Sequence, residues 1–384
     1  MWPVRHEGQR LRLLLAGDVM TGRGVDQILP SPGDPTLLES YLKDARDYVG
    51  LAEEVSGPLP RPVPPEWPWG EALPLMRSLS ADLATVRVMN LETSVTRSDD
   101  ATPHKPVRYR MSPENVGCLA LPGVDVWALA NNHVLDYGTR GLRETLATLA
   151  RAGLRVAGAG ANLQEAWQPA VVVTEGRRLL VWSAAHASSG TPTSWAADAT
   201  SPGVALLPDL SRATADRLLA SVASRRRHGD LVVVSVHWGS NWGYDVPEEQ
   251  VRFAHRLLDG GVDVVHGHSS HHPRPLEVYD GRLVLYGCGD LVNDYEGIAG
   301  EGARYRDDLR VLYVVDLSGP PPGATTGWSV RDVRLVVLQS RRLRLELAEA
   351  ADVTWLADRL TSASQRFGVR LEVVDDAILA AAHR

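Results

Sequence analysis

Cysteines and long apolar runs are scarce in this chain of 384 residues. Cys118 and Cys288 are its two cysteines, which excludes a disulfide framework and makes a reducing compartment the default. No stretch approaches ~20 uninterrupted apolar residues, so we expect no integral membrane segment. The apolar run at residues 11–16 is too short for a secretory signal and reads as a strand. These absences together predict a cytoplasmic protein.

Basic clusters are equally rare. Forty Lys and Arg against 47 Asp and Glu give a formal net charge of −7, with a pI near 6.0. The only basic run, at residues 225–227, follows a helical pattern and reads as a solvated helix end. Because phosphate binding needs clustered Lys and Arg, we expect no nucleic-acid partner.

What the chain does contain is a cluster of histidines at residues 264–275, which read V-V-H-G-H-S-S-H-H-P-R-P. The four histidines are His266, His268, His271 and His272. Neutral imidazole is a common metal ligand, and the end of a buried strand can hold several in one geometry. The alternative is that the four histidines only decorate a surface turn.

Polar side chains also follow four earlier apolar runs, at the point where each predicted strand ends. They are Asp18 after residues 11–17, Asn90 and Glu92 after 85–89, Asn132 and His133 after 124–130, and His237 after 231–236. Oxygen and nitrogen ligands without cysteine suit Zn, Mn or Fe in an open, catalytic site. Two such ions can activate water for hydrolysis. Asp18 has a second interpretation, as the cap of the helix that follows it.

The order of the elements predicts the fold class. Further strands are expected at 155–158, 170–174, 179–183, 262–265 and 282–286, and helices at 73–84, 141–152, 210–227 and 251–258. Residues 309–384 form a β-rich end with strands at 311–317, 330–338 and 369–374 and a helix at 350–364. Alternating β and α units followed by this end predict an α/β layered sandwich. No linker separates two parts, so residues 1–384 are interpreted as one domain.

Residues 30–74 interrupt this pattern with ten prolines. Such a density excludes a central strand or a long regular helix, apart from a helical patch at 37–55, so the segment is an insertion outside the core. Trp67 and Trp69 either close over a pocket or pack on the flank of the domain.

The strand-end motifs resemble those of the bacterial capsule-synthesis CapA family, the poly-γ-glutamate biosynthesis proteins. The matching stretches are G-D-V-M-T-G-R from Gly17, N-L-E-T from Asn90, L-A-N-N-H-V-L-D-Y-G from Leu129, G-A-G-A-N from Gly158, H-W-G from His237, and G-H-S-S-H-H-P from Gly267. This family in turn resembles calcineurin-like metallophosphoesterases. The resemblance implies a sandwich of two β-sheets flanked by helices, with one or two divalent metal ions at the strand ends.

Carried over by position, the resemblance assigns roles to individual residues. It makes Asp18 a ligand of the first metal and Glu92, or alternatively Asn90, the bridging group. It makes Asn132 and His237 ligands of the second metal, with His268 and His271 as the last histidine pair. His133 corresponds to the histidine that protonates the leaving group, a task suited to a group with a pKa near neutrality.

This chain departs from the family patterns at three places. Met20 stands where the phosphoesterases have a histidine, and a thioether is a poor ligand for a hard hydrolytic metal. The bridging position lies in N-L-E, without the usual second aspartate, and Ser269-Ser270 stands where the commoner CapA form has His-Pro. A mononuclear site is therefore an alternative to a dinuclear one.

Other residues near these motifs have two interpretations. Asp136 is expected either to fix the turn after His133 or to orient the His133 ring. Arg23, which follows the Asp18 turn, is expected to bind an anionic substrate, whereas Arg108 and Arg110 either do the same or form surface salt bridges. His266 is either a further ligand or a contact behind the ligands, and His272 is either a further ligand or exposed to solvent. Asp290 is a candidate for a contact behind the ligands, and Arg274 for support of the loop.

Three functions remain open. The first is a metal-dependent hydrolase or transferase that attacks a phosphoryl or γ-glutamyl amide centre of an anionic substrate. The second is a non-catalytic accessory protein of a polymer synthase complex, with a vestigial metal site. The third is an enzyme that tailors a small molecule beneath an aromatic lid. The fold does not decide among them.

Overall fold

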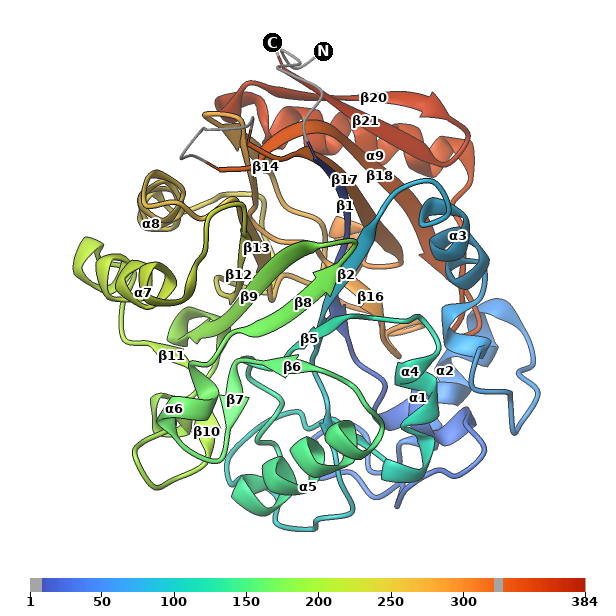
Figure 1. Cartoon of the computed structure of the whole chain (residues 1–384). Coiled ribbons are helices and arrows are strands. Elements are labelled where there is room, and N and C mark those ends of the chain that lie inside the picture. Colours follow the sequence, from blue (N-terminus) through green and yellow to red (C-terminus); the bar gives the residue numbers. More distant parts are fainter. Residues whose placement is uncertain (1–8, 321–326, 384) are drawn as a thin grey trace.

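The computed structural model describes residues 9–320 and 327–383 (Figure 1). Its centre is a pair of β-sheets with helices on their outer faces, as the α/β sandwich interpretation predicts. The single-domain interpretation also covers residues 1–8, 321–326 and 384, which lie outside the described residues, and it stays a prediction.

The first sheet runs in the order β20-β21-β18-β17-β1-β2-β5-β6, with β16 beside β1 and β19 beside β18. Its strands are β1 (Arg10–Val19), β2 (Thr85–Leu91), β5 (Val126–Ala128), β6 (Val156–Ala157), β16 (Asp290–Val292), β17 (Leu309–Ser318), β18 (Ser329–Ser340), β19 (Leu345–Leu347), β20 (Val369–Asp375) and β21 (Ile378–His383). β1, β2, β5, β6 and β16 are parallel, whereas β17 to β21 pair antiparallel. The β-rich C-terminal part therefore extends this sheet.

The second sheet runs in the order β11-β9-β12-β13-β15-β14, with β8 beside β9. Its strands are β8 (Ala170–Thr174), β9 (Arg177–His186), β11 (Leu206–Leu207), β12 (Leu231–His237), β13 (Val264–His268), β14 (Leu276–Tyr279) and β15 (Arg282–Leu285). β9, β12, β13 and β15 are parallel. Two short pairs lie outside the large sheets: β3 (Ser94–Val95) with β4 (Arg110–Met111), and β7 (Ala159–Gly160) with β10 (Gly203–Val204).

The core between the sheets is made by alternate residues of facing strands. Leu13 and Val86 of the first sheet and Val233 and Val264 of the second belong to one buried cluster. Because side chains of a strand point alternately to its two faces, the other residues of these strands face the helices. Strands buried on both faces explain why the sequence shows continuous apolar runs and no alternation.

Helices cover both outer faces (Figure 1). Those beside the first sheet are α1 (Arg23–Ile28), α2 (Arg46–Ser56), α3 (Ala72–Leu79), α4 (Gly117–Ala120) and α5 (Gly138–Arg151). Those beside the second sheet are α6 (Leu163–Ala166), α7 (Arg212–Arg225) and α8 (Glu248–Asp259). α9 (Ala350–Ala363) contributes its apolar side to the core between the sheets. Among the described residues, the helices lack the length and apolar character required to cross a bilayer.

The proline-rich segment 30–74 packs against the flank of the first sheet. Trp69 is fully buried there and its indole N–H donates to the carbonyl of Cys118 over 2.8 Å. Trp67 donates likewise to the carbonyl of Arg342 over 2.9 Å. Both tryptophans therefore pack on the flank of the domain, which was one of the two interpretations of the sequence. α2 is shorter than the helical patch expected at 37–55.

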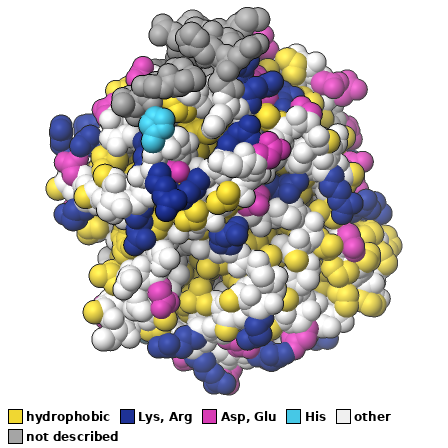
Figure 2. Space-filling view, in the orientation of Figure 1, with side chains coloured by type: hydrophobic (Ala, Val, Ile, Leu, Met, Phe, Trp, Pro, Cys, Tyr) yellow, Lys and Arg dark blue, Asp and Glu magenta, His cyan; other side chains and the backbone are white. Residues whose placement is uncertain are grey.

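Basic side chains are dispersed over the surface in Figure 2, where Lys and Arg alternate with Asp and Glu on the described part of the face shown. A continuous basic patch is absent from this part of the face.

Candidate metal centre

The candidate site lies where parallel strands of both sheets end. In the first sheet Asp18 pairs in register with Asn90 of β2 and Asp290 of β16. In the second sheet His237, the last residue of β12, pairs in register with His268, the last residue of β13. The carboxyl ends of β1 and β2, and of β12 and β13, therefore lie at one edge, where α/β folds present ligands. β16 begins at this edge with Asp290.

Asp18 is the residue at which the two sheets meet. Its Oδ1 accepts a hydrogen bond from Asn90 Nδ2 over 2.7 Å, and its Oδ2 accepts one from the backbone N–H of Ser269 over 3.1 Å. A side chain on Gly17 would collide with the carbonyl of Gly289, so glycine is required for this approach of β1 to residues 287–290. Asp18 therefore serves the site and does not cap α1, where the side chain of Asp294 accepts from the backbone N–H of Gly24 over 2.8 Å.

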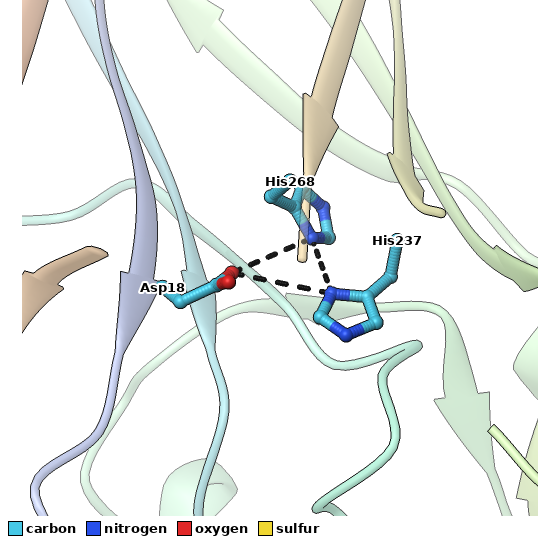
Figure 3. Close-up of side chains that lie close together, drawn as sticks. All are labelled: Asp18, His237 and His268. Carbon is cyan, nitrogen blue, oxygen red and sulfur yellow. Dashed lines mark hydrogen bonds and ion pairs between the residues drawn. The ribbon is translucent and has the colours of Figure 1, made fainter. Parts of the chain in front are cut away.

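One group of possible ligands comprises Asp18, His237 and His268 (Figure 3). The Nδ1 atoms of the two rings are 2.8 Å apart, and they lie 4.0 and 3.6 Å from Asp18 Oδ1. All three side chains are buried. The three atoms face one another, as the ligands of one metal ion do.

A second group comprises Asp18, His271 and Asp290. His271 Nδ1 lies 3.0 Å from Asp290 Oδ1, and Asp290 also accepts a hydrogen bond from Asn293 Nδ2 over 2.7 Å. Asp18 is common to both groups. This places Asp290 among the possible ligands, whereas the sequence indicated only a contact behind them.

The chemistry of the first group fits a cation. His237 Nε2 lies 2.9 Å from Asn132 Oδ1, which as an amide oxygen accepts, so Nε2 carries the proton and Nδ1 presents a lone pair. Burial lowers the pKa of His237 and of His268 well below the ordinary value, so both rings are neutral at pH 7. A lone pair that faces a second imidazole and a carboxylate in a buried site is satisfied by a metal ion.

Glu92 and Asn132 lie beside these groups. Glu92 Oε1 is 3.6 Å from His237 Nε2 and 3.7 Å from His133 Nε2, and Oε2 is buried without a hydrogen-bond partner among the described residues. Burial, together with the charge of Asp18, raises the pKa of Glu92 well above its ordinary range. Glu92 thus lies at the edge of the cluster with one carboxyl oxygen that has no hydrogen-bond partner among the described residues. A cation beside this oxygen would compensate for the missing partner.

His133 forms a separate arrangement with Asp136. Asp136 Oδ2 lies 2.6 Å from His133 Nδ1 and also accepts from the backbone N–H of Tyr109 over 2.7 Å. Since a carboxylate only accepts, His133 carries its proton on Nδ1 and turns Nε2 toward Glu92. Asp136 therefore orients the His133 ring, as expected from the sequence.

Lys105 is the cation of this arrangement, and no motif in the sequence indicated it. Its ammonium contacts Asp136 Oδ1 and the carbonyl of Asn132, and lies 2.9 Å from His133 Nδ1. Burial lowers its pKa, against the charge of Asp136. Lys105 lies in the loop between Thr102 and Tyr109, where neither strand pattern nor spacing relates it to His133; only its unusual place between two prolines distinguishes it.

Charges in the site shift several pKa values. Burial and the charge of Asp290 raise the pKa of Asp18 to about 7. Burial lowers the pKa of His133 to about 4, with Lys105 acting in the same direction and Asp136 against it. Burial has the largest effect on His271 and lowers its pKa, but the charge and hydrogen bond of Asp290 together with the charge of Asp18 outweigh it, so the net pKa is raised. Closely spaced carboxyl groups that share protons in this way gain most from a bound cation.

Arg23 is placed differently from the sequence expectation. It is 3% exposed, and its guanidinium donates to both carboxylate oxygens of Asp294, over 3.1 and 2.5 Å, and to Glu39 over 2.9 Å. It also stacks over the rings of Tyr48 and Tyr109, 3.9 and 4.4 Å from their centroids. The Arg23 guanidinium, which we expected to bind a substrate anion, is therefore already paired with the buried carboxylates of Asp294 and Glu39.

The remaining candidates fall behind or beside the cluster. Arg108 and Arg110 donate to backbone carbonyls of Thr102, Ser98 and Asp34. His272 is fully buried, accepts from the backbone N–H of Gly243 and stacks on Tyr305, which differs from the expected exposure. His266 lies behind His268, as expected, and Arg274 holds the carbonyl of Asp245.

Comparisons with known proteins agree with the motif resemblance. Residues 12–295 match the family model described as bacterial capsule synthesis protein PGA_cap. A probable polyglutamine synthesis accessory protein of Mycobacterium tuberculosis is 48% identical over 369 residues, which cover 96% of this chain and 94% of that protein. The PGA biosynthesis protein CapA of Bacillus subtilis is 27% identical over 69% of this chain and 68% of its own length.

Among solved structures, a 5′-nucleotidase precursor from Thermus thermophilus aligns with 93% of this chain and 59% of its own, at 13% identity and a TM-score of 0.45. A likeness of that degree carries no argument about function.

Proposed function

This chain belongs to the bacterial capsule synthesis protein PGA_cap family, and we propose that it is a metal-dependent hydrolase or transferase of an anionic substrate. The observation that carries the proposal is that Asp18 belongs to two groups of possible metal ligands at once. A carboxylate that belongs to two such groups would be able to serve both ions of a dinuclear centre.

In this proposal His237 and His268 would hold one ion, His271 and Asp290 would hold the other, and Asp18 would serve both. Glu92 would add a carboxylate from the side of His133, and Asn132, predicted as a ligand, instead accepts from His237 Nε2 and orients that ring. The ligands are nitrogen and oxygen atoms, which suit Zn, Mn or Fe. When bound, such ions polarise a phosphoryl or carbonyl oxygen and lower the pKa of a water molecule to near neutrality.

His133 transfers the proton in the proposed reaction. Its Nδ1–H is held by Asp136, so Nε2 is the nitrogen that takes up a proton and returns it to the leaving group. The pKa of about 4 in the substrate-free protein makes the ring neutral at pH 7. An anionic substrate beside Nε2 favours the protonated ring and so prepares it as an acid.

Lys105, in place of Arg23, supplies the fixed positive charge beside His133. Its hydrogen bond to the carbonyl of Asn132 ties this charge to the loop that carries His133. A phosphate ester and a γ-glutamyl amide both offer the negative charge and the electrophilic centre that this arrangement requires. The names of the relatives, which concern polyglutamine and PGA synthesis, favour the γ-glutamyl class.

A second function is a non-catalytic part in a polymer synthase complex. The relative with 48% identity is named an accessory protein, and this name supports a synthase-complex partner. The oriented pair of His133 and Asp136 favours the enzyme instead, because a purely structural metal site has no need of a proton donor.

Turnover of phosphoesters and γ-glutamyl amides by the metal-loaded protein tests the proposal. We expect activity on one of these classes that His133→Ala lowers by about 10²- to 10⁴-fold. His104→Ala, which removes an exposed histidine of the neighbouring loop, is the matched control and keeps full activity. Equal, background rates of the wild type and His133→Ala on both classes would favour the accessory function.

A further inference from the structure

Two tyrosines lie beside the candidate centre, and the proposed reaction does not use them. Tyr109 directly precedes β4, and Tyr295 follows β16. Although they are 186 residues apart in the chain, their hydroxyl oxygens lie 2.7 Å from one another. This distance is that of a hydrogen bond between two hydroxyl groups.

Tyr109 is tied to the half of the site that contains the proposed proton donor. Its ring packs edge to face with the His133 ring, with 4.5 Å between the centroids and 77° between the planes. Its backbone N–H donates to Asp136, the carboxylate that orients His133, over 2.7 Å. The guanidinium of Arg23 lies over the same tyrosine ring, 4.4 Å from its centroid. Because Tyr109 is also only 1% exposed, its hydroxyl is held in one position.

Tyr295 is tied in the same way to the other half of the site. Its ring packs against His271, with 5.2 Å between the centroids and 76° between the planes. Its backbone N–H donates to Asn293 Oδ1 over 3.1 Å, and the amide of Asn293 donates to Asp290 over 2.7 Å. His271 and Asp290 belong to one group of possible ligands, so this group fixes the place of Tyr295.

The two tyrosines and the candidate centre form a closed circuit of contacts. By one route, the hydroxyl pair connects the ring beside His133 to the ring beside His271. By the other route, Glu92 Oε1 lies 3.7 Å from His133 Nε2, and the backbone N–H of Glu92 donates to Val19, the neighbour of Asp18. Asp18 belongs to a ligand group with His271. A substrate that reaches both His133 and the ligand groups therefore lies beside the hydroxyl pair.

The hydroxyl pair has one proton more than its own hydrogen bond uses. The ordinary pKa of tyrosine, about 10, keeps both hydroxyls protonated at pH 7. One of them donates to the other, and the accepting hydroxyl retains a proton for which the described residues provide no acceptor. Burial raises the pKa of Tyr295 well above its ordinary value, and the charges of Asp290 and Glu92 add to the rise, which agrees with a hydroxyl near both carboxyl groups.

We infer that the hydroxyl pair of Tyr109 and Tyr295 donates this proton in a hydrogen bond to an anionic oxygen of the substrate, and that both tyrosines thereby determine specificity. The inference rests on the proposed function, because it names a substrate contact in the same site. The oxygen belongs to a phosphoryl group or to the carboxylate of a γ-glutamyl group. A neutral donor fits a site in which Arg23 is already paired with two carboxylates. Hydrogen bonds to charged groups are stronger than those between neutral groups.

Binding of inorganic phosphate and of glutamate to the metal-loaded protein, measured by calorimetry, tests the inference. Either hydroxyl can be the outer donor, so the double variant Tyr109→Phe, Tyr295→Phe is required. It removes both hydroxyls and keeps both rings. We expect it to bind one of the two probes about 10- to 100-fold more weakly than the wild type. The metal content by elemental analysis should be unchanged, because neither tyrosine belongs to a ligand group.

Tyr313→Phe is the matched control. The hydroxyl of Tyr313 is also buried without a hydrogen-bond partner among the described residues, but this residue lies in the core between the sheets. We expect the control to bind both probes as the wild type does. For a substrate that is turned over, the double variant should raise KM by a similar factor and change kcat less, whereas partial unfolding would lower kcat at an unchanged KM.

The outcomes separate this inference from the proposed function. Weaker binding in the double variant alone would support the inference, and the probe affected would assign the oxygen to a phosphoryl group or to a carboxylate. Wild-type affinity in a folded double variant with full metal content would overturn it and leave the metal centre standing, as would a metal-loaded wild type that binds neither probe. Weaker binding in the double variant without turnover of any phosphoester or γ-glutamyl amide would refute the proposed catalysis and retain the anion site.

Discussion

The Nδ1 atoms of His237 and His268 lie 2.8 Å apart while their Nε2 atoms are turned to Asn132 and Ser235. The rings come from the adjacent parallel strands β12 and β13. They lie side by side at the carboxyl ends of these strands, because His237 and His268 are paired in register. Asp18 of the other sheet completes the convergence. Two sheets that pack face to face thus bring three ligand atoms together with little help from loops.

Asp136→Asn is expected to lower turnover by about 10²- to 10⁴-fold and to leave the metal content unchanged. The amide cannot accept from His133, Tyr109 and Lys105 as the carboxylate does, so His133 loses its orientation. Initial rates and elemental analysis of the same preparation check both parts. Asp99→Asn, a change of an exposed carboxylate nearby, should alter neither. Full activity of Asp136→Asn would contradict the role given to His133.

Arg23→Met is expected to lower the free energy of unfolding by about 3–5 kcal/mol. The substitution leaves the buried carboxylates of Asp294 and Glu39 without their cation. Denaturant unfolding monitored by circular dichroism measures the effect. Arg140→Met removes an exposed pair with Asp99 and should cost less than about 1 kcal/mol. A stable Arg23→Met protein with an increased KM would instead restore the anion-binding role expected from the sequence.

The buried carboxyl of Asp263, which lies outside the candidate site, is expected to make the free energy of unfolding depend on pH. Burial raises its pKa to about 6, although Arg226 and the backbone N–H groups of Val232 and Trp328 act against this. The folded protein therefore binds the proton more tightly than the unfolded chain, whose carboxyl has a pKa near ~3.9. Asp263 therefore stabilises the folded state below about pH 4. This contribution, about 3 kcal/mol of the free energy of unfolding, is lost as the pH rises to 6.

The measurement is the free energy of unfolding of wild type and Asp263→Asn at several pH values from 4 to 7. Other carboxyl groups titrate in both proteins, so the difference between the two isolates Asp263. We expect the wild type to lose stability relative to the variant as the pH rises from 4 to 6. A constant difference over that range would show that the pKa of Asp263 is unshifted.

Much of the fold could be predicted from the sequence because its strands are apolar runs that end in glycine or polar residues. The strand expected at 170–174 coincides with β8, and the apolar run at 231–236 corresponds to β12. The short strands β14, β16 and β21 were not predicted. These strands form by pairing with neighbouring strands, and a single chain segment carries little sign of such pairing.

Part of the candidate site could likewise be predicted from the sequence, and part could not. A polar residue after a buried strand indicates where it will lie, which is why Asp18, His237 and His268 were found from the sequence. Asp290, which follows the strand expected at 282–286, was found by the same rule but was expected only as a contact behind the ligands, because its pairing beside Asp18 depends on the short strand β16 that begins with it. Nearness along the chain does not fix the direction of a long side chain: Arg23 lies five residues from Asp18 and turns to Asp294. Lys105 reaches the site through a loop whose path depends on tertiary contacts.

Metal content of the protein, purified without chelator and measured by elemental analysis, tests the central claim most directly. We predict about two equivalents of Zn, Mn or Fe in the wild type, both lost in Asp18→Ala because Asp18 belongs to both groups. His268→Ala and Asp290→Ala should each lose one equivalent, and His104→Ala none. A folded wild-type protein that holds no metal, even after reconstitution with each of the three ions, would contradict the account.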